Sequence, residues 1–370
     1  MNVLFAYRAI DGIAGGIERM ITRVMNEMVV RGHTVSFLTW DEEGAQSFYS
    51  IDDRIAWHKL NMGHYSGKAG SMLRIRRAGA VRKIVRKIDP QLIVCFSDGP
   101  FMAMRAYAAG LGVPVIVAER NAPTRFEHLH NGISSKVSYA SFHTAARVLI
   151  QVEGYRKHYP ASLHKRITTI PNPVMAAPRD GESIHKDAGR LRLLSVGRLS
   201  YQKNYPALVA AFAQIAGQHP NWDLVVVGEG EDRAALERQI AESPGLTGRV
   251  QLAGASQDVH AWYRSADLFC LASRWEGFPN ALGEALSHGI ASVGYAGCAG
   301  VSDLIHDKQN GLLAAGNGDP TTLAEALGTL MASPQDRQNY GRAAIASVAE
   351  YEPTRIYSLW EKTLLECAKP

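Results

Sequence analysis

The first 38 residues decide the fold class. They begin with the apolar run 2-NVLFAY-7, which is typical of a buried strand, and continue through the glycine-rich stretch 11-DGIAGG-16. Residues 17–31 then carry apolar side chains every three to four positions, and 34-TVSFL-38 is a second strand-like run. A strand, an amphipathic helix and another strand in this order predict a parallel β-α-β unit.

The same alternation extends over all 370 residues and predicts an α/β protein with parallel sheets. Further strands are expected at 91–96, 113–118, 147–151, 167–170, 191–196, 223–227, 250–253, 268–271 and 292–295, with helices at 206–217, 231–241, 281–288 and 320–331. Pro171-Asn172-Pro173 and the polar stretch to Gly189 are typical of a linker. We expect two Rossmann-like domains facing each other across a cleft, residues 1–172 and 173–352, with a closing helix in 353–370 that packs back toward the first domain.

Composition excludes several classes of protein. Hydrophobic residues make up 46% and charged residues 20% of the chain, which is typical of a globular protein rather than a disordered one. The four cysteines (Cys95, Cys270, Cys298 and Cys367) lie far apart, so neither a disulfide framework nor a zinc knuckle is expected. No apolar run approaches the ~20 residues of a membrane span and no signal peptide is recognisable, so a reducing cytoplasmic location is expected.

Charge is distributed unevenly along the chain. Residues 1–172 contain 23 Lys and Arg against 13 Asp and Glu, whereas residues 173–370 contain 17 against 22. The first half is therefore basic and the second acidic, although the net charge is only +5. Nucleic acid, an anionic membrane surface and a phosphorylated substrate would each suit the basic half.

A run of cations without any acid lies in the basic half. Its members are Lys68, Arg74, Arg76, Arg77, Arg82, Lys83, Arg86 and Lys87. Apolar residues alternate with them, as in a basic amphipathic helix over 72–88 that binds a membrane surface or phosphate groups. The alternative is the solvated face of an ordinary helix. Like charges one turn apart repel, which favours a functional role over a stabilising one.

Two glycine-rich or basic turns follow predicted strands and precede predicted helices. Gly15 and Gly16 would let backbone approach an anion at a helix N-terminus, but the full G-x-G-x-x-G is absent and a plain turn is equally compatible. Arg198 and Lys203 follow the strand at 191–196, where two cations could neutralise a diphosphate. An exposed basic turn is the alternative for that pair.

A third candidate is 274-RWEGFPNALGEAL-286, which follows the strand at 268–271. Pro279 disfavours a helical Phe278, so Glu276 should lie in a loop. Asn280 should cap the next helix, which would place Glu284 near its first turn. Two carboxylates beside a helix N-terminus could bind sugar and ribose hydroxyls; the alternatives are a solvated loop charge and dipole compensation.

Glu119, Arg120 and Asn121 form a fourth polar group, immediately after the strand at 113–118. Such residues could line a cleft or form a structural turn. The 13 histidines include no H-E-x-x-H motif, so no metal is expected.

Together these motifs resemble the retaining glycosyltransferases of family 4, which have the GT-B fold. The motifs are, in chain order, Gly15-Gly16-Ile17-Glu18-Arg19, Pro171-Asn172-Pro173, Val196-Gly197-Arg198-Leu199 with Lys203-Asn204, Val227-Gly228-Glu229-Gly230, residues 273–280 with Glu284-Ala285-Leu286, and Asn310-Gly311-Leu312-Leu313. Each motif alone is modest, but the ordered set is highly specific. The Glu-Gly-Phe-Pro-Asn variant is similar to bacterial enzymes that extend lipid-linked glycans, O-antigens or capsules.

The resemblance implies a role for each matching residue. Glu276, Arg198 and Lys203 would form the catalytic set: the two cations would hold the donor diphosphate with the Gly16 N–H, and Glu276 would contact the donor sugar. Glu284 would bond the ribose hydroxyls, and the base would lie near residues 252–259. Backbone of the following residues would assist: Gly277, Phe278, Pro279, Asn280, Ala281 and Leu282. No metal or other cofactor is expected, since the cations stabilise the leaving diphosphate.

The acceptor side of the cleft would be lined by Gly15, Glu119, Arg120 and Asn121. Many relatives carry a histidine where this chain has Arg120, and an arginine cannot act as a base. The resemblance therefore implies front-face departure of the diphosphate, whose oxygen takes the acceptor's proton, without a protein nucleophile.

The implied activity is transfer of a hexose or N-acetylhexosamine (GalNAc, GlcNAc, Gal or Glc) from a UDP-sugar, with retention of the α anomer. The acceptor would be a polyprenyl-diphosphate-linked glycan or another envelope glycolipid, at the cytoplasmic face of the inner membrane. The basic helix would bind the anionic membrane surface, and nucleic acid would not be a partner. Two alternatives are a nucleotide-sugar 2-epimerase, which needs no acceptor, and a non-catalytic glycan- or lipid-binding protein, which would release no UDP.

Overall fold

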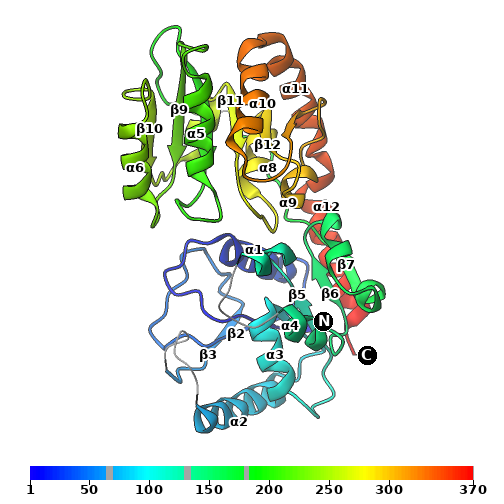
Figure 1. Ribbon diagram of the computed structural model, residues 1–370. Coiled ribbons are helices and arrows are strands. Elements are labelled where there is room, and N and C mark those ends of the chain that lie inside the picture. Colours follow the sequence, from blue (N-terminus) through cyan, green and yellow to red (C-terminus); the bar gives the residue numbers. More distant parts are fainter. Residues whose placement is uncertain (64–69, 129–134, 179–182, 370) are drawn as a thin grey trace. The chain divides into compact units, whose positions relative to one another are not determined.

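The computed structural model describes residues 1–63, 70–128, 135–178 and 183–369 (Figure 1), so Lys68 of the basic run lies outside the described residues. The chain forms two compact units. Unit 1 comprises Met1–Asn172 and Thr354–Pro370, and unit 2 comprises Pro173–Pro353. Every strand pairing in both units is parallel, which confirms the predicted α/β class with two Rossmann-like domains.

Within the described residues, unit 1 holds a seven-stranded sheet of order β3-β2-β1-β4-β5-β6-β7. Its strands are β1 (Asn2–Ala6), β2 (Thr34–Thr39), β3 (Ala56–Lys59), β4 (Leu92–Phe96), β5 (Val115–Ala118), β6 (Val148–Ile150) and β7 (Ile167–Thr169). Its helices are α1 (Gly16–Val30), α2 (Ser71–Ile88), α3 (Asp98–Tyr107), α4 (Ser135–Phe142) and α12 (Pro353–Cys367). Strand order reverses between β1 and β4, the point where such sheets bind ligands.

Helices from both ends of the chain cover the core of unit 1. The apolar face of α1 buries Met20, Ile21 and Val24 against the sheet. Helix α12 adds Trp360, which is fully buried and stacks on Phe96 with ring centroids 5.8 Å apart and planes at 2°. The last helix of the chain is therefore a structural part of the first unit.

Unit 2 holds a six-stranded sheet of order β10-β9-β8-β11-β12-β13 among the described residues. Its strands are β8 (Leu191–Val196), β9 (Trp222–Val227), β10 (Val250–Gly254), β11 (Leu268–Leu271), β12 (Ser292–Tyr295) and β13 (Gly311–Ala314). Its helices are α5 (Tyr205–Ile215), α6 (Arg233–Glu242), α7 (Val259–Arg264), α8 (Asn280–Ser287), α9 (Ala299–Ser302), α10 (Pro320–Ala332) and α11 (Pro334–Ser347). Strand order here reverses between β8 and β11.

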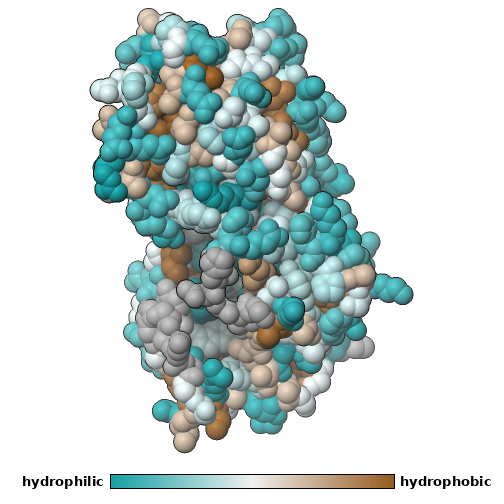
Figure 2. Space-filling view, in the orientation of Figure 1, coloured by the Kyte–Doolittle hydropathy of each residue, from teal (hydrophilic) through white to brown (hydrophobic). Residues whose placement is uncertain are grey.

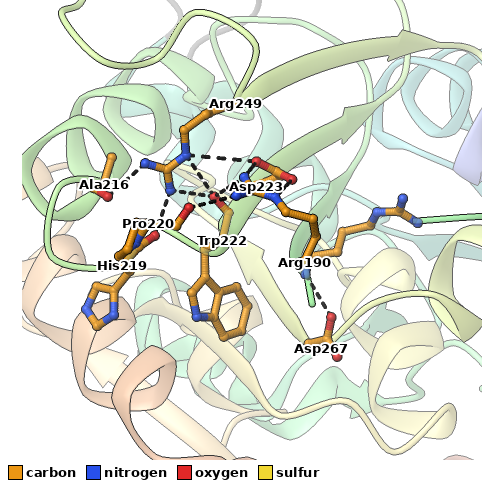
Figure 3. A network of polar contacts seen from close by, with 9 residues as sticks. Arg190, Ala216, His219, Pro220, Trp222, Asp223, Arg249 and Asp267 are labelled. Atoms are coloured by element: carbon orange, nitrogen blue, oxygen red, sulfur yellow. Dashed lines mark hydrogen bonds and ion pairs between the residues drawn. The ribbon is translucent and has the colours of Figure 1, made fainter. Parts of the chain in front are cut away.

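A polar network ties the amino ends of β8, β9 and β10 together (Figure 3). Arg190 forms a two-point ion pair with Asp223, and Arg249 donates to the carbonyls of Ala216, His219 and Trp222 at 2.5–2.8 Å. These cations are thus engaged with a carboxylate and with loop carbonyls, which indicates a structural role. In parallel α/β sheets, ligands bind at the opposite edge, where the carboxyl ends of the strands lie.

Helix α2 carries the basic run, and its cations divide into two groups. Arg74, Arg76, Lys83, Arg86 and Lys87 are exposed, beside the exposed apolar side chains of Met72 and Ile75. In Figure 2, apolar and hydrophilic side chains adjoin at the lower end of unit 1, where Figure 1 draws α2. None of the described helices is both long and apolar enough to cross a membrane.

The prediction that all seven cations of α2 face a membrane is wrong for Arg77 and does not fit Arg82. Arg77 is buried, and its guanidinium donates to the Met62 carbonyl at 2.8 Å. Arg82 is half-buried and donates to the Tyr107 and Ala109 carbonyls at 3.2 and 2.7 Å. Both side chains bind backbone carbonyls, those of Met62 and Ala109 in loops and that of Tyr107 at the end of α3. The helical spacing of charges in the sequence does not predict such contacts.

Candidate active site

The candidate site lies at the carboxyl edge of the unit 2 sheet, after the neighbouring strands β8 and β11. Two hydrogen bonds join the loops that follow these strands. The Arg274 N–H donates to the Gln202 carbonyl at 2.8 Å, and the Gln202 amide donates to the Trp275 carbonyl at 2.8 Å. Residues 73 positions apart are thereby held side by side, and the loops bring Lys203 and Glu276 together.

An ion pair between a half-buried lysine and a buried carboxylate forms the centre of this site. Lys203 Nζ lies 2.5 Å from Glu276 Oε1, and Glu276 is only 5% exposed. Ser273, which is fully buried, donates its hydroxyl proton to the same oxygen at 2.6 Å. A buried carboxylate is tolerated when it is both paired and hydrogen-bonded, and Glu276 meets both conditions.

Glycine at position 300 lets helix α9 approach this carboxylate residue. A Cβ atom at Gly300 would lie 2.8 Å from the Glu276 carbonyl oxygen and 2.9 Å from its Cβ. Any larger residue would push the loop outward, so the small residue helps to fix the backbone that carries Glu276.

Glu284 lies on the helix that follows the same loop. Helix α8 begins at Asn280 with Pro279 as its N-cap residue, so the prediction that Asn280 caps the helix and places Glu284 near the first turn is wrong. Glu284 falls in the second turn, where its Oε2 accepts a hydrogen bond from the Tyr263 hydroxyl at 3.1 Å. Tyr263, the last residue but one of α7, carried no sequence signal for this contact.

The structure offers fewer backbone N–H donors between Gly277 and Leu282 than the sequence predicted. Pro279 has no N–H, and the N–H groups of Asn280 and Leu282 donate to the carbonyls of Phe278 and Pro279 at 3.0 Å. The tight turn that starts α8 uses these groups itself. This leaves the N–H groups of Gly277, Phe278 and Ala281 for the role expected of this segment.

Arg198 stands apart from the buried pair. Its side chain is 74% exposed and forms an ion pair with Glu231 at 3.1 Å. Gly197, its neighbour in the chain, lies against the Lys203 side chain, because a Cβ at Gly197 would be 3.1 Å from Lys203 Cε. Among the residues that the structure describes, no three His, Cys, Asp or Glu side chains gather in a way that could hold a metal ion.

In unit 1, Gly15 and Gly16 begin helix α1 next to an acidic side chain. A Cβ at Gly15 would lie 2.1 Å from Glu18 Oε2, so the carboxylate of Glu18 occupies the space that only glycine leaves open. The Tyr7 hydroxyl donates to Glu18 Oε1 at 2.9 Å and fixes it there. Gly16 is exposed as the first residue of α1, the position from which its N–H was expected to meet an anion.

Glu119 lies within a buried ionic network. Glu119 is 3% exposed and pairs with Arg125 at 3.2 Å, and Arg125 also pairs with Asp98 at 3.1 Å. Burial raises the pKa of Glu119, and the Arg125 charge opposes that rise. The Asn121 N–H donates to Glu119 Oε1 at 3.1 Å. The carboxylate expected to line a cleft therefore serves this internal network.

Arg120 is buried against aromatic rings. The side chain is 4% exposed, with its guanidinium carbon 4.9 Å from the Trp360 ring centroid and 5.4 Å from that of Phe96. Nη1 donates weakly to the Ile170 carbonyl at 3.4 Å. Burial lowers the pKa of Arg120 to about 9, against a rise caused by Glu119.

Comparison with known proteins identifies the family. The model described as "Glycosyl transferase 4-like domain" matches residues 15–173, and that described as "Glycosyl transferases group 1" matches residues 178–347. An uncharacterized glycosyltransferase of Haemophilus influenzae is 26% identical over 83% of this chain and 84% of its own. The GalNAc-alpha-(1->4)-GalNAc-alpha-(1->3)-diNAcBac-PP-undecaprenol alpha-1,4-N-acetyl-D-galactosaminyltransferase of Campylobacter jejuni is 26% identical over 95% and 96%.

A solved structure agrees with the fold. Anabaena HepE in complex with UDP superposes with a TM-score of 0.75 at 16% identity, covering 99% of this chain and 100% of its own. The two family matches follow one another along the chain: the first covers β2 to β7 of unit 1, and the second covers the whole described sheet of unit 2. This chain therefore belongs to the glycosyltransferases of family 4 with the GT-B fold.

Proposed function

We propose that this glycosyltransferase moves a hexose or N-acetylhexosamine from a UDP-sugar to a polyprenyl-diphosphate-linked or other envelope glycan, with retention of the α configuration. The observation that carries the proposal is the buried Lys203–Glu276 pair with Ser273 at the carboxyl edge of the unit 2 sheet. In that arrangement the diphosphate of a sugar nucleotide can bind the cation, and the sugar hydroxyls can bind the anion. Two similar proteins support the choice of donor and acceptor, since one acts on an undecaprenol-linked glycan and the other was solved in complex with UDP.

In the proposed mechanism, the diphosphate replaces Glu276 as the partner of Lys203. Arg198, which is exposed, turns from Glu231 to the same diphosphate, so that two cations neutralise the charge that develops on the leaving group. The sugar hydroxyls replace Lys203 as partners of the Glu276 carboxylate, which stabilises the oxocarbenium-like state. The departing diphosphate oxygen removes the acceptor's proton on the same face, so no protein nucleophile and no metal enter the proposal.

The ribose hydroxyls are assigned to Glu284. That carboxylate lies eight residues beyond Glu276, on helix α8, and its half-buried side chain keeps access to solvent. The N–H groups of Gly277, Phe278 and Ala281 complete the donor contacts. Gly15 and Asn121 of unit 1 are proposed for the acceptor side, and the Gly16 N–H for the donor diphosphate. Glu119 and Arg120 are left out of this proposal, because both are buried in internal contacts.

The proposed location is the cytoplasmic face of the inner membrane, reached through helix α2. Five exposed cations lie on this helix beside exposed Met72 and Ile75, a combination that suits anionic headgroups and the acyl boundary. Arg77 and Arg82 are left out of this proposal, because their guanidinium groups bind backbone carbonyls.

The activity is tested by measuring UDP release from UDP-glucose, UDP-galactose, UDP-GlcNAc and UDP-GalNAc, with and without undecaprenyl-diphosphate-linked glycans. Release that requires an acceptor supports transfer, and an α-linked product supports retention. Conversion of the donor without acceptor would support the 2-epimerase alternative. Binding without any turnover across the acceptors would support a non-catalytic protein, and either result would overturn the proposal.

Membrane binding is tested by replacing Arg76, Lys83, Arg86 and Lys87 with Ser and sedimenting the protein with anionic liposomes. Each cation near an anionic surface contributes about 1 kcal/mol, so we expect binding to weaken about a hundredfold or more. The control replaces four exposed cations elsewhere, Arg238, Lys308, Arg342 and Lys362, with the same change in net charge. Equal loss in both variants would contradict a specific role for α2.

A further inference from the structure

We propose that the hydroxyl groups of Ser273 and Tyr263, which flank strand β11 on either side, are positioning groups for Glu276 and Glu284 respectively. Each hydroxyl donates to one of the two carboxylates assigned to the donor. The inference rests on the proposed function. It divides donor recognition into contacts with the sugar, through Glu276, and contacts with the ribose, through Glu284, which separate substitutions can disturb. Neither hydroxyl would touch the donor; each would act through its carboxylate.

Ser273 keeps Glu276 in place when its counter-ion is withdrawn. Lys203 and Ser273 share one acceptor, Glu276 Oε1, at 2.5 and 2.6 Å. When a diphosphate takes Lys203, the hydrogen bond from Ser273 remains to hold the carboxylate. A hydrogen bond to a buried charge is among the stronger ones in proteins, so it can fix the orientation of the Glu276 carboxylate.

Tyr263, which precedes β11 in the chain, plays the matching part for Glu284. Its side chain is 1% exposed, and its hydroxyl lies 3.1 Å from Glu284 Oε2 and 3.0 Å from the Ala281 carbonyl. The single phenolic proton is attracted most strongly by the charged acceptor. The hydroxyl therefore anchors Glu284 to the first turn of its own helix.

The ring of Tyr263 is itself held by neighbours. It packs against Phe269 of β11 and against His288, with ring centroids 6.0 and 5.0 Å apart. His288 Nδ1 lies 2.8 Å from the Glu284 carbonyl oxygen, so this nitrogen carries a proton and donates. Strand β11 and the end of α8 thus fix both the tyrosine and the residue that it contacts.

Two single-hydroxyl deletions test the inference: Ser273→Ala and Tyr263→Phe. Calorimetry measures the binding of UDP and of one UDP-sugar, namely whichever of the four above binds the wild-type chain most tightly. UDP release measures turnover. Tyr263→Phe should raise the Kd of UDP and the donor KM about tenfold and leave kcat unchanged. Ser273→Ala should leave the Kd of UDP unchanged and lower kcat about tenfold or more, since UDP carries no sugar for Glu276 to contact.

The chain offers a matched control for each variant. Tyr295 and Ser292 are buried in β12, and their hydroxyls donate to the backbone carbonyls of Asp319 and Ile290 at 2.7 and 3.1 Å. Tyr295→Phe and Ser292→Ala should alter thermal stability as much as the test variants and change neither Kd nor kcat.

A double-mutant cycle separates positioning from stability. In a Glu276→Gln background, Ser273→Ala should cause no further fall in kcat, because the carboxylate it positions is already gone. Additive losses, or equal effects of test and control variants, would overturn the inference. If the wild-type chain bound none of these nucleotides, the proposed function would fail, and the inference with it; binding without the predicted split would overturn the inference alone.

Discussion

The carboxyl edges of the two sheets hold a half-buried lysine and a buried arginine in different ways. In unit 2, Lys203 pairs with a carboxylate at 2.5 Å, and a serine hydroxyl completes the set. In unit 1, Arg120 lies over the rings of Trp360 and Phe96, and among the described residues its Nε and Nη2 have no hydrogen-bond partner. One edge pairs its cation directly with a carboxylate, whereas Arg120 at the other edge lies against aromatic faces and forms one long hydrogen bond with the Ile170 carbonyl.

The difference has consequences for both stability and function. A ring face attracts a cation more weakly than a carboxylate does, so burial dominates at Arg120 and lowers its pKa to about 9. A buried ion pair instead makes each partner depend on the other. Only the second arrangement lets a ligand exchange partners with the protein, because a sugar diphosphate brings both an anion and hydroxyl groups.

The largest expected effect comes from breaking the ion pair with Lys203→Ala. Transfer should fall by about 10³-fold, the range seen when a group that stabilises developing charge is removed. The free energy of unfolding should fall by about 3 kcal/mol, because Glu276 loses its counter-ion. UDP-release kinetics and urea denaturation measure the two effects.

The control for that variant is Lys186→Ala, which breaks the Lys186–Asp267 ion pair at the opposite edge of the same sheet. It should cost stability without changing kcat. Full transfer activity in the Lys203→Ala protein would remove Lys203 from the proposed mechanism.

The next effect comes from removing the ring beneath Arg120 with Trp360→Ala. Trp360 is fully buried, so the substitution should lower the free energy of unfolding of unit 1 by about 3–5 kcal/mol. Hydrogen exchange should show lost protection in β4 and β5, and Trp360→Phe should lose less. Unchanged protection in unit 1 would show that α12 does not stabilise that sheet.

A smaller, pH-dependent effect is expected from Arg120→Met. The pKa of Arg120 is lowered to about 9 in the folded chain and is higher in the unfolded chain, so between these two pKa values the unfolded chain binds more protons. Burial of the charge therefore costs stability in full below pH 9, and the cost falls as the pH rises above 9. The Arg120→Met variant avoids this cost, so at pH 8 its free energy of unfolding should exceed that of the wild type. This difference should shrink by about 1 kcal/mol between pH 8 and pH 10.

Urea denaturation of both proteins across this pH range measures the difference between them, which cancels titrations that they share. A difference that stays constant from pH 8 to pH 10 would contradict the lowered pKa. A variant less stable than wild type at pH 8 would show that the contacts with Trp360 and Phe96 outweigh the desolvation of the charge.

The smallest effect is expected at the exposed pair of the site, through Glu231→Gln. Exposed ion pairs contribute about 0–1 kcal/mol, so unfolding should barely change. Because Arg198 loses a competing partner, the Kd of UDP should fall about twofold, as measured by calorimetry. Weaker UDP binding would show that Glu231 assists Arg198 rather than competing with it.

Sequence periodicity anticipated most strands but missed β3 and β13. Both are edge strands of four residues. Strand β3, 56-AWHK-59, has no buried residue and no apolar run to mark it, and β13 buries only its end residues, Gly311 and Ala314. Hydrophobic patterns in a sequence indicate which residues are buried. A strand that pairs with a neighbour on one side alone is less buried, so its sequence pattern is weak. The motif order, in contrast, was sufficient to indicate the family that the comparisons show.

The sequence by itself determined that the chain is α/β throughout, that its pattern restarts after Pro171-Asn172-Pro173, and which charged residues follow strand ends. These features depend on spacing between near neighbours, which local physics controls. Only the tertiary structure decided that Lys203 and Glu276 neutralise each other, that Arg77 is buried and Arg120 stacks on Trp360, and that Ser273 and Tyr263 contact the two carboxylates. Most of these contacts join residues far apart in the chain, and they arise only once the strand order has brought β8 beside β11 and α12 beside β4.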